Sequence, residues 1–355
     1  MHKARQRAAA EIAGQLGADA LLVAGLVSIR YLSGFTGSEA TLLITGNSSL
    51  FLCDSRYTLQ ASAEVNGCKV EEYKIKIDGI LTAIKASGCR RLAFDAEKMA
   101  VAFFNKLSSL LPEVEFVPLA DQLDRLRGVK TAEEILLVEN SAKLASAAFK
   151  ELLPMISPGV SERFLAVELE MLMKRSGAEN KAFDFIVAAG ERGALPHGAP
   201  SDRLINSGEL VTFDFGACCK GYNSDETVTV AVGRPEKSLL EIYSIVKDAH
   251  DMAIAAIRPG AKCRAVDAVA RDYIGSRGFG ENFGHGLGHG VGLEIHEKPV
   301  FSPRSDDILV EGMIVTVEPG VYLPGIGGVR IESLLLVTAN GSRLLGGVDK
   351  NIIFC

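Results

Sequence analysis

Residues 211–232 have the sequence VTFDFGACCKGYNSDETVTVAV, in which two alternating apolar runs flank a short polar segment. Alternation with a period of two predicts strands with one apolar face, so Asp214 lies on the face opposite its phenylalanine neighbours. A hairpin centred between Cys219 and Lys220 would place Asp214 directly opposite Asp225, with their Cβ atoms about 4.5 to 5.5 Å apart. Two carboxylates held that close repel each other, and a bound cation would remove the conflict. The stretch therefore predicts an antiparallel hairpin that carries metal ligands.

A second pair of carboxylates follows the same logic near the end of the chain. Glu318 continues an apolar strand, residues 319–328 are expected to form a turn, and Arg330 and Glu332 return on a common face of the next strand. Glu318 and Glu332 can therefore also meet, which gives two hairpins with a carboxylate on each arm.

A glycine- and histidine-rich segment lies between the two hairpins. Residues 283–297, FGHGLGHGVGLEIHE, contain three histidines and five glycines, and glycine at this density lets the backbone approach a ligand closely. Four carboxylates with one or two imidazoles suit Mn²⁺, Co²⁺ or Fe²⁺ at least as well as Zn²⁺. Two such ions about 3.5 to 4 Å apart can share a water, lower its pKa and polarise a carbonyl, so the set indicates hydrolysis.

Each of these features alone also has a structural explanation. A single aspartate in a strand is usually solvated or hydrogen-bonded, and a histidine beside glycines is more often structural than a ligand. The glycine-rich run lacks the strand, helix and downstream acidic residue of a dinucleotide fingerprint. The coincidence of two carboxylate hairpins with a histidine cluster is what favours a metal site.

Composition excludes several classes of protein. The 355 residues carry a net charge of −6 and contain no block of five or more Lys or Arg that could bind along a phosphate backbone. Nucleic acid is therefore not expected as a partner. The apolar runs are far shorter than the ~20 residues that span a bilayer, and the basic N-terminus lacks the pattern of a secretory signal. Seven irregularly spaced cysteines predict a reducing, cytoplasmic setting, with Cys218 and Cys219 as ordinary thiols on the hairpin turn.

The pattern of elements predicts two domains in an α/β (α+β) protein. Residues 1–125 alternate helical stretches with short apolar runs and are expected to form a small α/β domain. Thr131 and Glu134 then form a capping-box pattern ahead of a long helix to about Met155, and Ser161 caps another. Residues 126–355 are expected to form a second domain, in which helices cover a mainly antiparallel sheet.

The motifs resemble those of the Xaa-Pro peptidases, prolidase and aminopeptidase P, of the pita-bread metallopeptidase fold. The matching segments are IVAAG at 186–190, LPHG at 195–198, DFG at 214–216, GYNSDET at 221–227, HGLGHGVGL at 285–293, VEPGVY at 317–322 and GVRIE at 328–332. Residues 29–38 and 54–57 resemble the creatinase-type domain that precedes the catalytic domain in this family. The resemblance covers nearly the whole chain and implies a creatinase-like domain followed by a pita-bread domain with a curved sheet.

The resemblance also implies a role for each candidate site residue. The implied ligands of two divalent ions, Mn²⁺ or Co²⁺ before Fe²⁺ or Zn²⁺, are Asp214, Asp225, His289, Glu318 and Glu332. His197, His285 and His296 would line the substrate site, with His197 and His296 hydrogen-bonding the scissile amide and the oxyanion. Glu318 would also move a proton to the leaving nitrogen, and Arg330 would orient carboxylates or substrate. Tyr322, Phe183 and Phe185 are candidate wall residues, although core packing is the commoner fate of a phenylalanine.

The implied reaction is hydrolysis of the Xaa-Pro bond by a hydroxide that bridges two ions, in a homodimer that acts on peptides with proline at the second position. Dipeptidase and aminopeptidase activity stay open alternatives. Two rival interpretations are a metal-free, creatinase-like amidinohydrolase and a non-catalytic, peptide-binding module of the same fold, both of which typically lack this ligand set. The chain departs from the family pattern at Val228, where arginine is common, and at Ser333, where aspartate is common.

Overall fold

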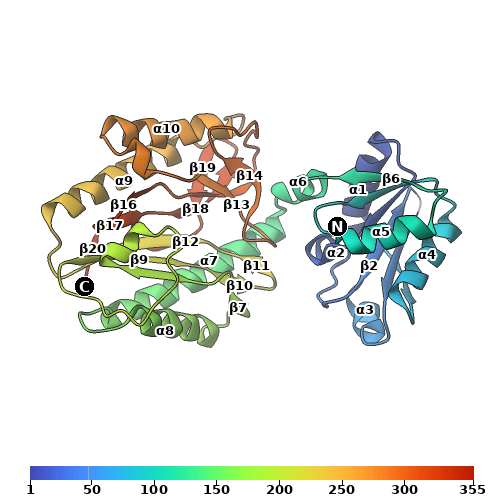
Figure 1. The fold of residues 1–355 in the computed structure, drawn as a ribbon, viewed down its shortest axis with the longest axis horizontal. Coiled ribbons are helices and arrows are strands. Elements are labelled where there is room, and N and C mark those ends of the chain that lie inside the picture. Colours follow the sequence, from blue (N-terminus) through green and yellow to red (C-terminus); the bar gives the residue numbers. More distant parts are fainter. Residues whose placement is uncertain (47) are drawn as a thin grey trace. The chain divides into compact units, whose positions relative to one another are not determined.

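The computed structural model describes residues 1–46 and 48–355, which divide into two compact units, Met1–Arg127 and Gly128–Cys355 (Figure 1). Within the described residues, no helix is both long enough and apolar enough to cross a membrane.

The first unit is built on one six-stranded mixed sheet. Its strands, in the spatial order β4-β3-β2-β1-β5-β6, are β4 (Lys69–Glu72), β3 (Ser49–Cys53), β2 (Thr41–Thr45), β1 (Ala20–Val23), β5 (Arg91–Asp95) and β6 (Glu115–Leu119). Its helices are α1 (His2–Gln15), α2 (Leu26–Ser33), α3 (Thr58–Glu64), α4 (Lys76–Ser87), α5 (Val101–Leu110) and α6 (Gln122–Gly128), the last of which ends at the boundary. The apolar faces of α4 and α5 pack on the central strands, which confirms the predicted small α/β architecture.

Four long helices belong to the second unit: α7 (Ala132–Leu152), α8 (Glu162–Arg175), α9 (Lys237–Ala256) and α10 (Cys263–Ser276). Thr131 caps α7 through the backbone N–H of Glu134, and the Glu134 side chain accepts from the backbone of Thr131, so the predicted capping box is present. The regular α-helix ends at Leu152, and a 3₁₀ turn continues to Met155.

The second unit contains four sheets. One has the order β20-β12-β9-β8, with β8 (Ile186–Ala189), β9 (Glu209–Phe215), β12 (Glu226–Val232) and β20 (Ile353–Phe354). Another has the order β14-β13-β15-β18-β19, with β13 (Gly288–Gly290), β14 (Glu297–Phe301), β15 (Ile314–Val317), β18 (Ser333–Thr338) and β19 (Gly341–Leu344). The smaller sheets join β7 (Asn180–Lys181), β10 (Ala217–Cys219) and β11 (Tyr222–Asn223), and pair β16 (Gly320–Leu323) with β17 (Gly327–Arg330). All pairs are antiparallel except β12 with β20.

Helices cover both sides of these strands. Figure 1 shows α9 and α10 on one side and α7 and α8 on the other. Phe149 of α7 stacks on Phe215 at 4.9 Å and meets Phe213 edge-on at 5.4 Å, and all three rings are fully buried. The apolar face of β9 therefore packs against α7. Asp214 lies on the opposite face of the strand, which points away from α7. The predicted mainly antiparallel sheet covered by helices is confirmed.

The first hairpin has a different register from the predicted one. Asp214 pairs with Thr227, and Cys219 pairs with Tyr222, so the turn is centred between Lys220 and Gly221. The prediction that Asp214 lies directly opposite Asp225 is therefore wrong. The placement of Cys218 and Cys219 on the turn is also wrong, because both belong to β10. Moving the centre by one residue shifts the register by two, which preserves the face of every side chain. Asp225 consequently lies diagonal to Asp214 on the same face.

The second hairpin is split into two ladders with a common register. Val317 pairs with Ser333 in one ladder, and Gly320 pairs with Arg330 in the other. Glu318 and Glu332 occupy matching positions in the gap between the ladders, so the register faces them towards each other as expected. The turn comprises only residues 324–326, because residues expected in a longer loop form β16 and the start of β17.

Candidate metal centre and substrate pocket

Among the described residues, the candidate metal ligands Asp225, His289 and Glu332 each place one ligand atom within 4.8 Å of the others. Nε2 of His289 lies 3.6 Å from Oδ2 of Asp225 and 3.4 Å from Oε1 of Glu318. On its other side, Nδ1 of His289 lies 3.1 Å from the carbonyl oxygen of Gly290. A carbonyl partner at Nδ1 fixes the ring so that Nε2 faces the carboxylates, which is the usual arrangement of a metal-binding histidine.

The carboxylates of this cluster repel one another. Burial and the charges of Glu332, Asp214 and Glu318 raise the pKa of Asp225 well above its ordinary value. Burial, Glu318 and Asp214 likewise raise the pKa of Glu332 well above its usual range. Burial also raises the pKa of Asp214, although the guanidinium of Arg330 opposes the shift. A divalent cation would stabilise all of these groups in their ionised forms.

Two oxygens of the cluster are unsatisfied. Among the described residues, Oδ1 of Asp214 and Oε1 of Glu332 are buried and have no hydrogen-bond partner. A buried orphan oxygen of this kind is rare in folded proteins and indicates a missing ion or water. Carboxylate oxygens with one imidazole are the donors that Mn²⁺, Co²⁺ and Fe²⁺ prefer, so the residues fit a divalent metal.

His289 and Glu318 each shift the pKa of the other. Burial acts to lower the pKa of His289, but the hydrogen bond and charge of Glu318 raise it above its ordinary value. Burial acts to raise the pKa of Glu318, but the hydrogen bond and charge of His289 lower it. A metal ion binds neutral imidazole and ionised carboxylate, so protons would compete with an ion for these two side chains.

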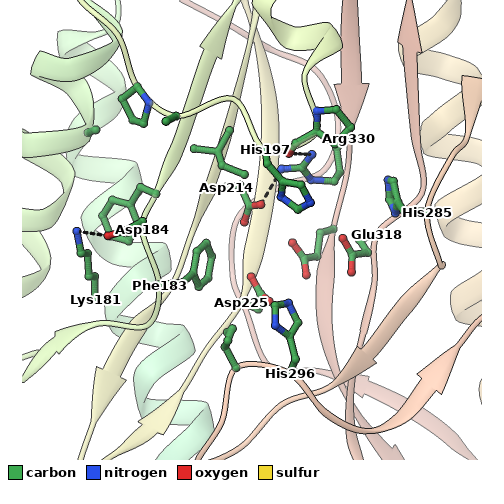
Figure 2. A pocket seen from close by; sticks show the side chains of 18 of the residues that line it. Lys181, Phe183, Asp184, His197, Asp214, Asp225, His285, His296, Glu318 and Arg330 are labelled. Atoms are coloured by element: carbon green, nitrogen blue, oxygen red, sulfur yellow. Dashed lines mark hydrogen bonds and ion pairs between the residues drawn. The ribbon is translucent and has the colours of Figure 1, made fainter.

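All of the predicted site residues line one cavity of about 890 Å³ in the second unit. Figure 2 shows the carboxylates of Asp214, Asp225 and Glu318 between the rings of His197 and His296. The full set of predicted residues in the lining is His197, Asp214, Asp225, His285, His289, His296, Glu318, Tyr322, Arg330 and Glu332, with Phe183 and Phe185 further along the wall. Phe185 also packs in the core of the unit, as expected for a phenylalanine.

The histidines of the cavity have distinct surroundings. The ring of His296 lies edge-on to that of His289 at 4.4 Å, and burial together with His289 lowers the pKa of His296. His285 lies 2.8 Å from the hydroxyl of Tyr322, and burial lowers the pKa of His285. His285 and His296 are therefore neutral at physiological pH, with one N–H each. The N–H of His285 is on Nδ1 and donates to the carbonyl of Gly286 at 2.8 Å, so its Nε2 accepts from the Tyr322 hydroxyl.

Arg330 joins three parts of the site. Its guanidinium donates to Oδ2 of Asp214 at 2.6 Å, to the hydroxyl of Tyr322 at 3.0 Å and to the carbonyl of Pro196 at 3.1 Å. Burial opposes the cation, but Tyr322 and Asp214 hold the pKa of Arg330 above its ordinary value. Arg330 thus ties a carboxylate of the cluster to the loop that carries His197, a link that the sequence alone did not reveal.

The two departures from the family pattern have simple surroundings. Val228 is buried in the apolar core of the second unit. The hydroxyl of Ser333 lies 3.0 Å from Nε2 of the buried His250. Glu332 receives a hydrogen bond of 2.7 Å from the hydroxyl of Thr227. This hydrogen bond involves neither Val228 nor Ser333.

A buried ion pair holds the segment around His296. Nζ of Lys130 donates to Oε2 of Glu297 at 2.9 Å, and the two side chains are only 2% and 1% exposed. Oε1 of Glu297 accepts from the backbone of Glu294 at 3.1 Å. This hydrogen bond closes a short turn over residues 294–297, and His296 lies within that turn. The pair leaves no signature in the sequence, because its members are 167 positions apart.

Replacing Lys130 with methionine is expected to destabilise the second unit by about 3 to 5 kcal/mol, because the Glu297 carboxylate stays buried without its partner. Urea unfolding followed by circular dichroism measures the change. The matched control is Lys181→Met, since Lys181 pairs with the 96% exposed side chain of Asp184 and an exposed pair contributes about 0 to 1 kcal/mol. Equal losses for the two variants would show that the Lys130–Glu297 pair is not important for stability.

Comparison with known proteins agrees with this architecture. The model of metallopeptidase family M24 matches residues 137–339, and the model of the creatinase/prolidase N-terminal domain matches residues 5–129. An Xaa-Pro dipeptidase of Pyrococcus horikoshii is 39% identical over 337 residues, with 94% of each chain covered.

Two solved structures have the same fold along the whole chain. The Xaa-Pro dipeptidase from Bacillus anthracis has a TM-score of 0.96 at 41% identity, covering 100% of this chain and 99% of that one. The X-Pro aminopeptidase from Thermotoga maritima has a TM-score of 0.91 at 36% identity, covering 99% of each. With its carboxylate hairpins, histidine-lined cavity and preceding creatinase-type domain, the chain belongs to metallopeptidase family M24.

Proposed function

We propose that this protein hydrolyses the Xaa-Pro bond and releases the N-terminal residue of dipeptides or longer peptides. The observation that carries the proposal is the convergence of five candidate ligands on one cavity that also holds three histidines. The similarity to proteins named as Xaa-Pro dipeptidase and X-Pro aminopeptidase supports the same substrate class.

In this proposal the metal ions are held by four carboxylates and one imidazole: Asp214, Asp225, His289, Glu318 and Glu332. When bound, a pair of such ions lowers the pKa of water and polarises the substrate carbonyl. The oxygen-rich donor set supports Mn²⁺ or Co²⁺ as the occupants. The unsatisfied oxygens of Asp214 and Glu332 support their assignment as ligands, because an ion supplies the partner that each lacks.

The remaining side chains bind the substrate and move a proton. His197 and His296 donate hydrogen bonds to the scissile amide and to the oxygen that gains charge in the transition state. His285, with Tyr322 beside it, lines the pocket for the residue next to the scissile bond. Glu318 is the carboxylate that would accept a proton from the attacking water and pass it to the leaving proline nitrogen.

Proline at the second position has a physical basis. The Xaa-Pro bond is a tertiary amide with no N–H and a fixed ring, so peptidases that bind that N–H handle it poorly. Here the walls are apolar and aromatic: Phe183, Ile295 and Tyr322 line the cavity. Such a wall fits the pyrrolidine ring and requires no donor from the scissile nitrogen.

The test is hydrolysis of Leu-Pro, Leu-Pro-Gly and Leu-Ala by protein loaded with Mn²⁺ or Co²⁺. We expect kcat/KM for the proline substrates to exceed that for Leu-Ala by about 10- to 200-fold, which is the discrimination that fitting an apolar group in a pocket provides. Cleavage of Leu-Pro without Leu-Pro-Gly identifies a dipeptidase, and cleavage of both an aminopeptidase. Equal rates on Leu-Ala contradict the proline specificity, hydrolysis of creatine without metal supports the amidinohydrolase, and inactivity on every substrate supports the binding module.

We also propose a homodimer in the cytoplasm. The seven cysteines, which all lie within the described residues, form no disulfide, which is typical of a reducing compartment. The dimer rests on the family resemblance, in which a partner subunit can help to close the peptide channel. Sedimentation equilibrium tests it against the mass of a single 37.8 kDa chain.

A further inference from the structure

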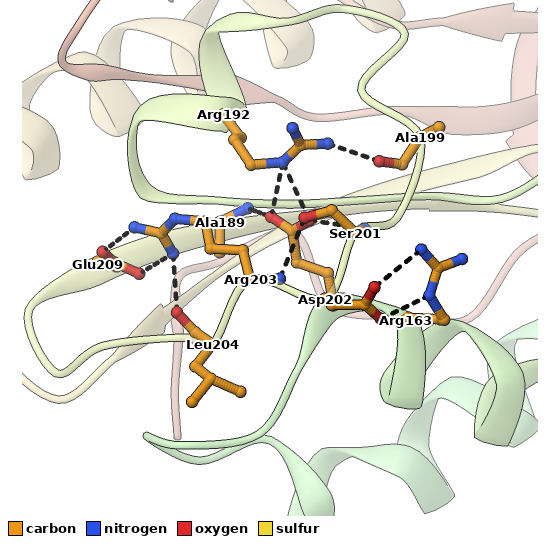
Figure 3. Close-up of polar contacts among 10 residues, drawn as sticks. Arg163, Ala189, Arg192, Ala199, Ser201, Asp202, Arg203, Leu204 and Glu209 are labelled. Carbon is orange, nitrogen blue, oxygen red and sulfur yellow. Dashed lines mark hydrogen bonds and ion pairs between the residues drawn. The ribbon is translucent and has the colours of Figure 1, made fainter.

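Glu162, in the first turn of α8, is a fully buried carboxylate that organises a loop of the second unit. One oxygen accepts from the backbone N–H of Ala189 at 2.8 Å, and the other accepts from the backbone N–H of Ser201 at 3.0 Å and its hydroxyl at 2.6 Å. Nε of Arg192 donates to both oxygens, at 3.2 and 3.0 Å. Figure 3 shows these donors converging on one side chain.

These donors lie at both ends of the segment that carries His197. Ala189 is the last residue of β8, Ser201 lies beyond the loop, and the side chain of Arg192 also donates to the carbonyl of Ala199 at 2.6 Å. One carboxylate therefore closes a loop of about a dozen residues, with His197 in its interior. On the cavity side, the loop is held by the hydrogen bond from Arg330 to the carbonyl of Pro196.

We propose that Glu162 is a positioning residue that fixes the place of His197 in the substrate cavity. His197 lines that cavity whereas Glu162 does not, so the carboxylate acts through the loop and not by touching the substrate. Closing the loop in advance removes conformational freedom that substrate binding would otherwise have to remove. The inference rests on the proposed function, because that function gives His197 its role as a hydrogen-bond donor.

The chain offers a matched control in the neighbouring Glu209. This carboxylate also accepts four hydrogen bonds, from Nη1 and Nη2 of Arg203 at 2.9 and 2.5 Å and from the backbone and side chain of Asn206, both at 3.0 Å. Figure 3 shows Glu209 paired with Arg203, close to Ala189. Its partners all lie after Ser201, so they do not enclose His197. A role in loop positioning is therefore specific to Glu162, whereas a general cost of losing a hydrogen-bonded carboxylate applies to both, although the Glu209 side chain is 17% exposed.

The first experiment is a double-mutant cycle on Leu-Pro hydrolysis with metal-loaded protein. We expect Glu162→Gln to lower kcat/KM by about 10- to 100-fold, as a displacement of about 1 Å in a reacting group does, with unchanged metal content. In the His197→Ala background the same substitution is expected to change kcat/KM less than about twofold, because the group it positions is gone. Glu209→Gln is expected to leave kcat/KM within about twofold in either background. If Glu162→Gln lowers kcat/KM as much in the His197→Ala background as in the wild type, the proposal is overturned.

The second experiment does not depend on catalysis. In ¹⁵N-histidine spectra the side-chain signals of His197 are identified among six histidines by their absence in His197→Ala. Glu162→Gln is expected to shift or broaden these signals and leave those of His289 unchanged, and Glu209→Gln is expected to leave both unchanged. Unshifted His197 signals in Glu162→Gln overturn the positioning role, even in a protein that does not cleave Leu-Pro. If Glu162→Gln does not fold, Ser201→Ala removes one of the same hydrogen bonds and must shift the same signals.

Discussion

Asp225→Asn is expected to lower the rate of Leu-Pro hydrolysis by about three orders of magnitude or more. The substitution removes the charge of a carboxylate that faces His289 and Glu332, and these three candidate ligands place their ligand atoms within 4.8 Å of one another. Losing metal assistance removes several kcal/mol of transition-state stabilisation, and about 4 kcal/mol corresponds to a thousandfold change in rate. Steady-state kinetics at saturating Mn²⁺ measures the rate, and elemental analysis measures the bound metal.

The same variant is expected to change stability in opposite directions with and without metal. Because burial and the neighbouring carboxylates raise the pKa of Asp225, its ionisation destabilises the metal-free wild type above that pKa, and asparagine removes this cost. In excess metal the wild type gains stability by mass action, about 2.7 kcal/mol at a hundred times the dissociation constant, and the variant gains less.

The control for this variant is Asp184→Asn, because Asp184 lines the same cavity but has an exposed side chain paired with Lys181. We expect it to keep both metal and activity. If Asp225→Asn keeps its metal content and its rate, the assignment of Asp225 as a ligand is wrong.

Glu318→Gln is expected to lower kcat by about 10²- to 10⁴-fold, which is the usual contribution of a positioned acid–base group, with a smaller change in KM. Glutamine keeps an oxygen that can bind a metal but cannot accept the proton of the attacking water. The measurement is kcat on Leu-Pro as a function of Mn²⁺ concentration, together with metal content.

The design separates proton transfer from metal loss. If excess Mn²⁺ restores kcat to the wild-type value, Glu318 acts only as a ligand and its proposed proton transfer is wrong. Glu170→Gln is the matched control, since Glu170 lines the cavity and pairs with Lys174 on α8. It is expected to retain the wild-type kcat.

The sequence predicts the faces of the strands better than their registers. Phe213 and Phe215 pack against α7, as alternation requires. Glu318 and Glu332 also share a face, and the common register of their two ladders places them opposite each other. The register of the first hairpin depends on its turn, and Lys220 adopts a positive φ of 49° that the sequence does not signal.

Elements without a periodic pattern were missed altogether. β4 has the sequence KVEE and lies at the edge of its sheet, where no residue is fully buried, so no alternation marks it. The partners of Glu162 and Glu297 were also beyond sequence reasoning, because each pairs with residues far along the chain and neither has a local signature. Motifs identify the groups that can react, whereas these contacts decide how firmly each group is held.

The candidate ligands come from separate sheets of the second unit. Asp214 and Asp225 belong to the hairpin of β9 and β12, whereas Glu318 and Glu332 lie between the ladders of β15–β18 and β16–β17. The hydroxyl of Thr227 already joins Glu332 across this boundary. Metal ions bound by these candidate ligands would add a second link between the β9–β12 hairpin and the strands that carry Glu318 and Glu332. The metal supply of the cell would then govern how long each molecule survives proteolysis as well as how fast it works.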